Sequence, residues 1–334
     1  MKVTGIGEIM LRLSTNKGKM VSQSDYFNVN YGGGEANVLI SLSKFGVDTC
    51  FISKVSDDDI GNTIIDYLKS HSVDTCYVSK VDKRTGIYFL QVGSGNRGSK
   101  VIYDRANSAF TSMKIGDFQL EEALKDTDIF HFSGITLALS EDIRDLIMKI
   151  LEHCKKHNIM VSYDSNYRSK LWSLEEASIE TFKIMPYINI LSAGNLDAEN
   201  ILKMSCDETD VYKKLQYYYD KITDRYPNIM HIYSSIRENK SASLNTLQCN
   251  YYKEKTLYSS KIQVIDDIVD RVGGGDALSA GVLYSILNNK SPEYLIEFAT
   301  SASVLKHSIY GDANLINVED VEQFMNNGIS KISR

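Results

Sequence analysis

The most informative segment of the chain reads Asp270-Arg-Val-Gly-Gly-Gly-Asp-Ala-Leu-Ser-Ala-Gly-Val-Leu283. Residues 264–269, directly before it, are rich in β-branched side chains, which favours an extended strand. After it, apolar side chains recur at the spacing of a helix. They are Ala277, Leu278, Ala280, Leu283, Tyr284 and Leu287. The sequence therefore predicts that three glycines and Asp276 lie at the N-terminus of a helix.

This arrangement is suited to binding a phosphate group. The start of a helix leaves several backbone N–H groups unpaired and carries about half a positive charge. Glycines allow an anion to approach that backbone closely. Beside such amides, Asp276 can accept a proton from an attacking hydroxyl, which is the role of a base in phosphoryl transfer. The structural alternative is a glycine-rich turn whose aspartate only caps the helix.

Strand-like and helix-like segments alternate along much of the remaining chain. The strand candidates are residues 51–55, 129–133, 159–163, 188–191 and 229–233. Between them lie helical patterns, such as the apolar face from Ile143 to Cys154. This alternation predicts an α/β fold in which a mostly parallel sheet carries helices on both faces. No linker rich in Pro, Gly or Ser divides the 334 residues, so we interpret 1–334 as a single domain.

A small β-rich excursion interrupts this alternation. Residues 86–92 and 100–105 are two β-rich runs that flank the turn-rich loop 93–99, which indicates a hairpin. Gly93-Ser-Gly-Asn-Arg-Gly98 matches a dinucleotide-binding pattern, but that pattern requires a helix after it, and here a strand follows. We expect a lid subdomain built from about 10–30 and 84–112.

Composition excludes several classes of function. The chain has 37 Lys and Arg against 43 Asp and Glu, a formal net charge of −6, which gives no indication of nucleic-acid or membrane binding. No apolar stretch approaches the roughly 18 residues of a membrane span. The five cysteines are scattered and form no CxxC pair, which is typical of reduced thiols. We therefore expect a cytoplasmic protein.

The segment from Asp270 to Asp276 resembles the C-terminal signature of the ribokinase-like (PfkB) carbohydrate kinases. Tyr31-Gly-Gly-Gly-Glu-Ala-Asn37, followed by Gly46 and Gly61, resembles their N-terminal signature. The resemblance implies a ribokinase-like fold with a small β-sheet lid, ATP as phosphoryl donor, and Mg²⁺. It also implies that Asp276 is the catalytic base and that Gly273, Gly274 and Gly275 face the transferring phosphoryl group.

Other segments resemble the 2-keto-3-deoxygluconate kinases in particular. They are Gly7–Arg12, Val101–Arg105, Phe132–Thr136, Asp164–Arg168 and Leu305–Asp312. The resemblance implies phosphorylation of the C6 hydroxyl of 2-keto-3-deoxy-D-gluconate. The sugar acid carries a carboxylate, which arginine binds through directed donors. Tyr103 and Arg105 lie two residues apart in a strand and so point the same way.

By this resemblance, the residues that contact the sugar acid are Gly33, Gly34, Asn37, Tyr88, Tyr103, Arg105, Ile135 and Arg168. Those that contact the nucleotide are Asn166, Asn195, Ser235, Arg237, Gly273, Gly275 and Asp312. Without the resemblance, a surface salt bridge is the alternative reading of Arg105 and Arg168.

Two segments depart from the family pattern on the nucleotide side. Asn195-Leu-Asp-Ala-Glu199 places Ala198 where many relatives have a glutamate tied to magnesium and phosphate. Ser234–Asn239 replaces a glycine-rich loop that often covers ATP. We therefore assign no residue to a metal. His153 and His157 have zinc-like spacing, but no third ligand is evident.

Two other functions remain open. The acceptor can be a different sugar, such as fructose, ribose or 5-keto-2-deoxygluconate. The chain can also be a non-catalytic protein that binds a sugar or a nucleotide on a kinase fold. In the family the lids of two subunits often pair, so we expect a homo-oligomer, a dimer or higher.

Overall fold

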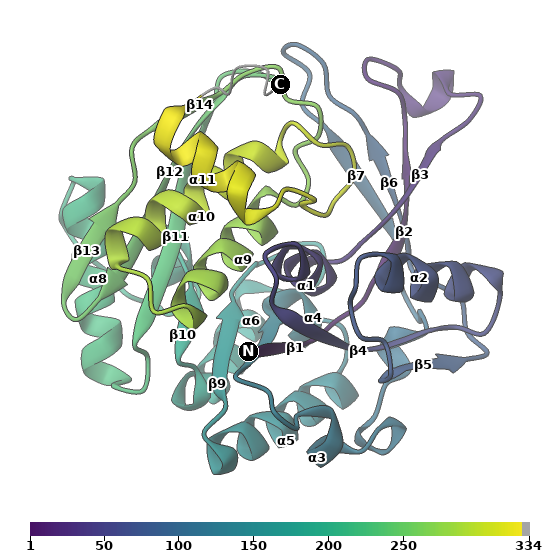
Figure 1. The fold of residues 1–334 in the computed structure, drawn as a ribbon, viewed down its shortest axis with the longest axis horizontal. Coiled ribbons are helices and arrows are strands. Elements are labelled where there is room, and N and C mark those ends of the chain that lie inside the picture. The colour runs from purple at the N-terminus through teal and green to yellow at the C-terminus, as the bar shows by residue number, and fades with distance from the viewer. Residues whose placement is uncertain (329–334) are drawn as a thin grey trace.

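A ten-stranded sheet runs through the molecule, and the computed structural model describes residues 1–328 of the chain (Figure 1). In spatial order the strands are β13 (Thr256–Ser259), β12 (Asn245–Lys253), β11 (His231–Asn239), β10 (Ile190–Ser192), β9 (Met160–Asp164), β8 (Ile129–Ser133), β1 (Lys2–Ile6), β4 (Asp48–Ser56) and β5 (Val78–Val81), while β14 (Gln263–Ile265) pairs with β12. The neighbouring strands β11, β10, β9, β8, β1, β4 and β5 pair in parallel, and β12, β13 and β14 add antiparallel pairs.

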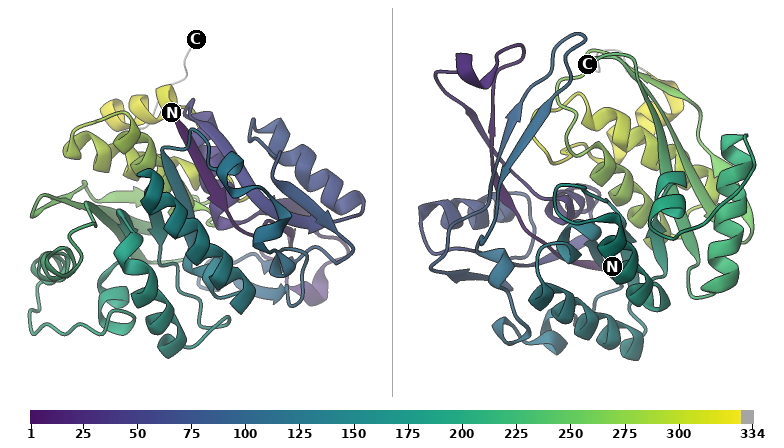
Figure 2. Two further views of the ribbon diagram at one scale, coloured as in Figure 1. Left: turned by 90° about the horizontal axis from the view of Figure 1, so that it is seen from below. Right: turned by 180° about the vertical axis from the view of Figure 1, so that it is seen from behind.

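Helices cover both faces of this sheet (Figure 2). One face carries α1 (Gly34–Lys44), α2 (Asp59–Ser70), α9 (Gly274–Leu287), α10 (Pro292–Lys306) and α11 (Val318–Asn327). The other carries α3 (Leu120–Ala123), α4 (Gly134–Leu137), α5 (Glu141–His157), α6 (Leu174–Ile184), α7 (Asn195–Asn200) and α8 (Val211–Arg225). Each face has its own buried apolar cluster. The predicted mostly parallel sheet with helices on both faces is confirmed.

Helix α5 illustrates how the sequence sets an element of this fold. Ser140 caps its start by accepting a hydrogen bond from the Ile143 amide at 3.3 Å. Its apolar side chains repeat at helical spacing and are buried against the sheet. The helix ends at Asn158, whose φ of 58° is left-handed, a conformation that asparagine tolerates better than most residues.

A second, four-stranded sheet stands away from the main one, at the upper right of Figure 1. Its order is β3 (Asn28–Gly32), β2 (Met10–Ser14), β6 (Ile87–Gln91) and β7 (Lys100–Asp104). Strands β6 and β7 form the predicted antiparallel hairpin. The GxGxxG match lies in its turn, where Ser94 and Arg97 bridge, so its interpretation as a turn is confirmed. We call this the small sheet.

The segment Ser234–Asn239, which replaces the glycine-rich loop of the family pattern, lies in a strand. It continues β11, pairing residue by residue with β12 from Ile232 opposite Tyr252 to Asn239 opposite Asn245. Ser235 and Arg237 therefore lie on a paired strand and not in a loop. Among the described residues, no helix is both long and apolar enough to cross a membrane.

Candidate active site

A cavity of about 920 Å³ lies between the small sheet and the carboxyl ends of β9 and β10, beside the start of α9. In open α/β sheets, ligands bind at this end of the strands. The cavity brings together the predicted residues Gly33, Gly34, Asn37, Tyr88, Tyr103, Arg105, Ile135, Asn166, Arg168, Ser235, Arg237, Gly273, Gly274, Gly275, Asp276 and Asp312. Asn195 is not among its lining residues.

The start of α9 presents unpaired amides to this cavity. The helix begins at Gly274, and the first main-chain bond near its start runs from the Ala277 amide to the Gly273 carbonyl, at 2.9 Å. The amides of Gly274, Gly275 and Asp276 find no acceptor among the residues that the structure describes. These donors and the helix dipole together favour an anion at this position.

The three glycines have different physical roles. Gly273 has a φ of 84°, and a Cβ there would lie 1.7 Å from the Asp312 carbonyl oxygen, so only glycine fits. A Cβ on Gly274 would lie 2.6 Å from the imidazole of His307. Only at Gly275 would a Cβ meet nothing within 4 Å. Gly273 and Gly274 thus allow tight packing behind the helix start, and Gly275 faces the open cavity.

Asp276 lies half-buried in the first turn of α9 and faces the cavity. Its Oδ2 accepts a hydrogen bond from Nδ2 of Asn37 at 2.7 Å. Burial raises the pKa of this carboxyl to about 7, and the nearby negative charges of Asp164, Asp312 and Glu35 act in the same direction. The hydrogen bond from Asn37 opposes the shift. A carboxyl that is poised near neutral pH is suited to accepting and releasing a proton.

A fully buried arginine connects the small sheet to the segment before α9. Arg12, on β2, donates to Asp270 at 2.6 Å and to Asp312 at 2.5 Å. Asp270 also accepts hydrogen bonds from the amides of Val272 and Gly311, each at 3.1 Å. The two carboxylates raise the pKa of the guanidinium above its ordinary value, so Arg12 stays charged.

Two predicted contacts with the sugar acid have protein partners. Tyr88 donates its hydroxyl hydrogen to Asp312, and both side chains are buried. The side-chain amide of Asn37 donates a hydrogen bond to Asp276. Their contacts with a sugar, and that of Asp312 with a nucleotide, stay predictions. In this structure the hydrogen bonds of Tyr88 and Asn37 connect different segments of the cavity wall.

Arg105 is not in the surface salt bridge that was the alternative reading. It is buried, and it donates through Nε at 2.8 Å and through Nη2 to the same oxygen of Glu8. Its guanidinium lies 5.8 Å from the ring centroid of Tyr103, as the shared strand face predicted. Nη1 has no hydrogen-bond partner among the described residues and remains available for a ligand.

Arg168 differs from Arg105 because no carboxylate in the described part of the chain forms an ion pair with it. Its Nη1 donates only to the Tyr167 carbonyl, at 3.1 Å. The side chain is exposed and lines the cavity. An exposed, unpaired guanidinium at a cavity wall is suited to a carboxylate ligand.

Two further arginines, Arg237 and Arg271, line the cavity near the start of α9. Burial and the positive charge of Arg271 lower the pKa of Arg237 to about 10. Nη2 of Arg271 donates to Asn239 at 2.6 Å. Neither guanidinium has a carboxylate partner among the described side chains. Two cations held together without counter-charges indicate a site for a strongly anionic group such as a triphosphate.

Of the altered motif of residues 195–199, Leu196 lines the cavity, but neither Ala198 nor Glu199 does. Ala198 is buried in the core, and Glu199 binds Lys214 at 3.2 Å and the Tyr218 hydroxyl at 3.0 Å. Glu199 therefore does not replace the missing glutamate. Asp164, at the end of β9, does line the cavity, and burial raises its pKa to about 6.

Sequence reasoning missed several residues of the cavity wall, chiefly Glu8, Asp164 and Arg271. Glu8 interrupts an apolar run and is buried, and a charge inside such a run was a usable signal. Asp164 and Arg271 belong to segments that resemble the family, but nothing in their local pattern separates a ligand contact from a surface charge.

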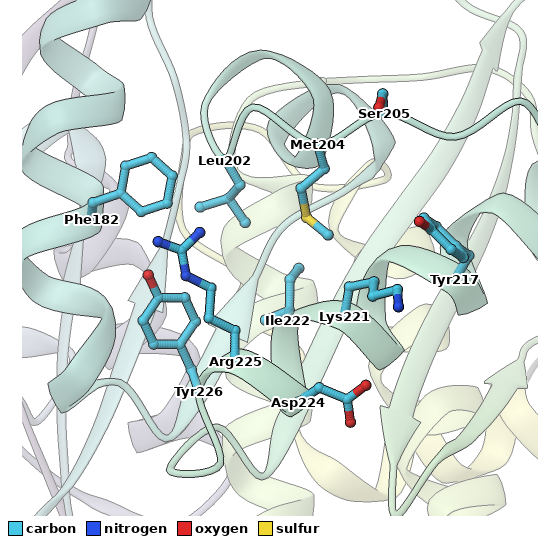
Figure 3. Close-up of a pocket in the computed structure, with 10 residues that line it drawn as sticks. All are labelled: Phe182, Leu202, Met204, Ser205, Tyr217, Lys221, Ile222, Asp224, Arg225 and Tyr226. Carbon is cyan, nitrogen blue, oxygen red and sulfur yellow. The ribbon is translucent and has the colours of Figure 1, made fainter.

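A second cavity, of about 560 Å³, lies between α6, α8 and the loop after α7 (Figure 3). Arg225 lies between two rings there, 5.0 Å from the centroid of Phe182 and 5.2 Å from that of Tyr226. The only carboxylate in its lining, Asp224, is ion-paired with Lys255 at 2.6 Å. Neither a free base nor a glycine-rich helix start lines this cavity, so it is not the candidate reaction site.

Comparison with known proteins supports the same reading. The profile of the pfkB family carbohydrate kinases matches residues 1–225. A PfkB family carbohydrate kinase from Listeria grayi superposes with a TM-score of 0.94 at 38% identity, covering 98% of this chain and 100% of its own. The 2-dehydro-3-deoxygluconokinase of Thermotoga maritima superposes with a TM-score of 0.95 at 36% identity, with the same coverage.

A curated relative is similar over the whole length at lower identity. The 2-dehydro-3-deoxygalactonokinase of Haloferax volcanii is 26% identical over 328 residues, which is 98% of this chain and 98% of that protein.

We expect the carboxyl of Asp276 to titrate near pH 7, about three units above an ordinary aspartate. Replacing Asn37 with Ala removes a hydrogen bond that favours the charged form, so the midpoint should move higher still. Carboxyl carbon-13 NMR, with Asp276→Asn to assign the signal, measures both midpoints. A midpoint near 4 in the native chain would contradict this description of the site.

Proposed function

The chain belongs to the pfkB family of carbohydrate kinases, and from this premise we propose that it phosphorylates the C6 hydroxyl of 2-keto-3-deoxy-D-gluconate with ATP. The chain is thus a phosphotransferase with an alcohol group as acceptor. The observation that carries the proposal is the carboxylate of Asp276, beside three unpaired amides in a cavity lined by free guanidinium groups.

In the proposed reaction, Asp276 takes the proton of the C6 hydroxyl as the oxygen forms a bond to the γ-phosphorus. The bond from that phosphorus to the β–γ bridging oxygen breaks, and ADP leaves. The amides at the start of α9 stabilise the negative charge of the transferring group, which is the main protein contribution to this type of reaction. Gly275 leaves the space that the group needs, because a Cβ built there would meet no other segment of the protein within 4 Å.

A sugar acid is favoured over a neutral sugar by the charges on the acceptor side. Arg168 has no ion-pair partner among the described residues, and Arg105 keeps Nη1 available. A neutral sugar would leave the guanidinium of Arg168 without a carboxylate within ion-pair distance, whereas the carboxylate of a sugar acid would pair with it. The relative from Haloferax volcanii favours the galactonate epimer as a second candidate.

ATP would bind beside the start of α9. The guanidinium groups of Arg237 and Arg271 would meet its phosphates, while Ser235 lies on the same rigid strand as Arg237. This end of the site carries positive charge although the whole chain is acidic. Asn195 lies outside the lining, so we do not propose it as a contact.

Magnesium would be bound mainly through the phosphates of the nucleotide. No group of three or more His, Cys, Asp and Glu side chains among residues 1–328 could hold a metal ion. Magnesium often takes one or two carboxylates and fills its other positions with phosphate oxygens and water. Asp164 fits this role, because its partly buried carboxylate lines the cavity. The ion would neutralise charge on the phosphates.

The small sheet would act as a lid over the sugar and as a contact between subunits. Alternate residues of its strands place Val29, Leu13, Phe89 and Ile102 in one row across the sheet. Val29 is 55% exposed and Ile102 43%, and Phe27 packs on Phe89 at 5.7 Å between ring centroids. An apolar row of this kind would be covered by the same row of a second copy in a homodimer.

Turnover should depend on the carboxylate of Asp276. In a coupled ADP-release assay with 2-keto-3-deoxygluconate, we expect Asp276→Asn to lower kcat by about 10²-fold or more, the scale of general-base removal. Native activity should fall as the pH drops through about 7, because the base becomes protonated. Asp66→Asn, on exposed α2, is the matched control and should retain full activity. Undiminished turnover in Asp276→Asn would reject the mechanism.

The acceptor should be a sugar acid, and Arg168 should discriminate for it. We expect Arg168→Ala to raise KM for the acid by about tenfold or more, the scale of one charge-assisted contact. The low activity toward fructose or ribose should not change. Arg225→Ala, in the separate cavity of Figure 3, is the matched control. If the native chain turns over neutral sugars as well as it turns over the acid, the proposal of a sugar acid as acceptor is wrong.

The chain should be at least a dimer in solution. Light scattering at assay concentration should give twice the chain mass of 37.6 kDa or more. Phe89→Glu places a charge in the apolar row and should give a monomer, whereas Tyr212→Glu, on exposed α8, should not. A native mass of one chain would contradict the proposed pairing.

A further inference from the structure

Lys306, the last residue of α10, is completely buried, with 0% of its surface exposed. Lysine is almost never fully buried unless its charge has a partner. Its Nζ donates to the carbonyl oxygens of Ile309, at 3.2 Å, and Asp270, at 3.4 Å. No carboxylate of residues 1–328 lies within ion-pair distance of this ammonium. A buried charge held only by main-chain carbonyls calls for a physical reason.

The two carbonyls belong to the two loops that form the back of the candidate anion site. Asp270 begins the segment that leads into α9, and Ile309 lies in the loop that follows α10. The two loops touch at Gly273, where a Cβ would meet the carbonyl oxygen of Asp312 at 1.7 Å and Cε of Lys306 at 3.3 Å. The side chain of Lys306 thus lies directly behind the turn that starts α9.

The end of α10 fastens the same segment at further points. Oγ of Ser303 donates to the Gly274 carbonyl at 2.7 Å. The His307 carbonyl accepts from the amides of Val269, at 2.9 Å, and Asp270, at 3.3 Å. These bonds fix the position of the chain, but they bring no positive charge. Lys306 supplies the charge at this place.

The charges behind the helix start balance only when Lys306 is protonated. Asp270 and Asp312 carry two negative charges, and Arg12 offsets one of them. Without the ammonium, one net negative charge would remain buried behind amides that are meant to attract an anion. In a protein interior, where the effective dielectric constant is about 20, such a charge acts over several ångströms.

We propose that the buried ammonium of Lys306 is a positioning group for phosphoryl transfer, which holds the two loops behind Gly273 together and neutralises the carboxylates behind the anion site. Lys306 touches neither substrate and acts through the main chain of the loops. The proposal rests on the role proposed above for the start of α9, and it does not depend on which sugar accepts the phosphoryl group.

The protonation state of Lys306 gives the role a pH signature. Burial lowers its pKa to about 8, although Asp270, Asp312 and Asp276 favour the charged form. Arg12 opposes the charge. The neighbouring His307 is uncharged over this range, because burial lowers its pKa to about 4. The ammonium is therefore present below about pH 8 and is lost as the pH rises through that value. We expect kcat to fall over the same range.

Lys306→Met removes the charge and keeps most of the side-chain volume. With both substrates saturating, we expect kcat to fall by about tenfold or more, with KM for the acceptor within about threefold of the native value. The alkaline fall of kcat near pH 8 should disappear. Lys149→Met, an exposed lysine of α5, should behave as the native chain. An unchanged kcat, or an alkaline fall that persists in Lys306→Met, would overturn the proposal.

Lys306→Ala leaves a space that an added amine can fill. Propylammonium should restore kcat in a saturable manner, and 1-propanol, which has a similar shape but no charge, should not. Restoration by both compounds, or by neither in a folded variant, would show that the role is only one of packing. If both variants fail to fold, the pH profile of the native chain is the test. A native kcat that stays level from pH 7 to 10 would also overturn the proposal.

These results are separable from a failure of the proposed reaction. Undiminished turnover in Asp276→Asn would reject the base but would leave the dependence on Lys306 measurable with any acceptor that is turned over. If kcat falls in Asp276→Asn but does not change in Lys306→Met, Asp276 remains the proposed base and only the positioning role of Lys306 is rejected.

Discussion

The buried guanidinium of Arg12 is the interaction on which the rest of the site depends. It joins β2 of the small sheet to Asp270, before α9, and to Asp312, after α10. These three parts of the chain are far apart in the sequence, and Arg12 forms an ion pair with both of the other two. Removing one partner of such a buried group costs about 3–5 kcal/mol, because the remaining charges lose their compensation. The geometry of the candidate active site therefore depends on a charge cluster that lies outside the cavity's reactive groups.

The placement of positive and negative groups follows a simple pattern around this cluster. Arg12 and Lys306 offset the charge of the carboxylates behind the helix start, which weakens the negative field at the amides of α9. In front, Asp276 is held by Asn37 in a half-buried position that raises its pKa to about 7. Arg168 and Arg237 both line the cavity, and we propose that Arg168 meets the acceptor and Arg237 the nucleotide.

Local patterns in the sequence predicted much of this arrangement. The alternation of segments gave the sheet and its helices, and the glycine run before an apolar helical repeat located the start of α9 and Asp276. Pairing over long distances could not be predicted in this way. Nothing near Arg12 indicates that it meets residues 258 and 300 positions later in the chain. Glu199 was one residue from the expected position, but the turn of α7 directs it toward α8.

A structure with 2-keto-3-deoxygluconate, ADP, magnesium and aluminium fluoride tests the central claim most directly, because the fluoride mimics the phosphoryl group in flight. The account predicts that the amides of Gly274, Gly275 and Asp276 donate to the fluoride atoms, and that the Asp276 carboxylate lies within hydrogen-bond distance, about 2.6–3.2 Å, of the C6 hydroxyl oxygen. A complex in which the fluoride lies away from the start of α9, or in which another group faces that hydroxyl, would contradict it.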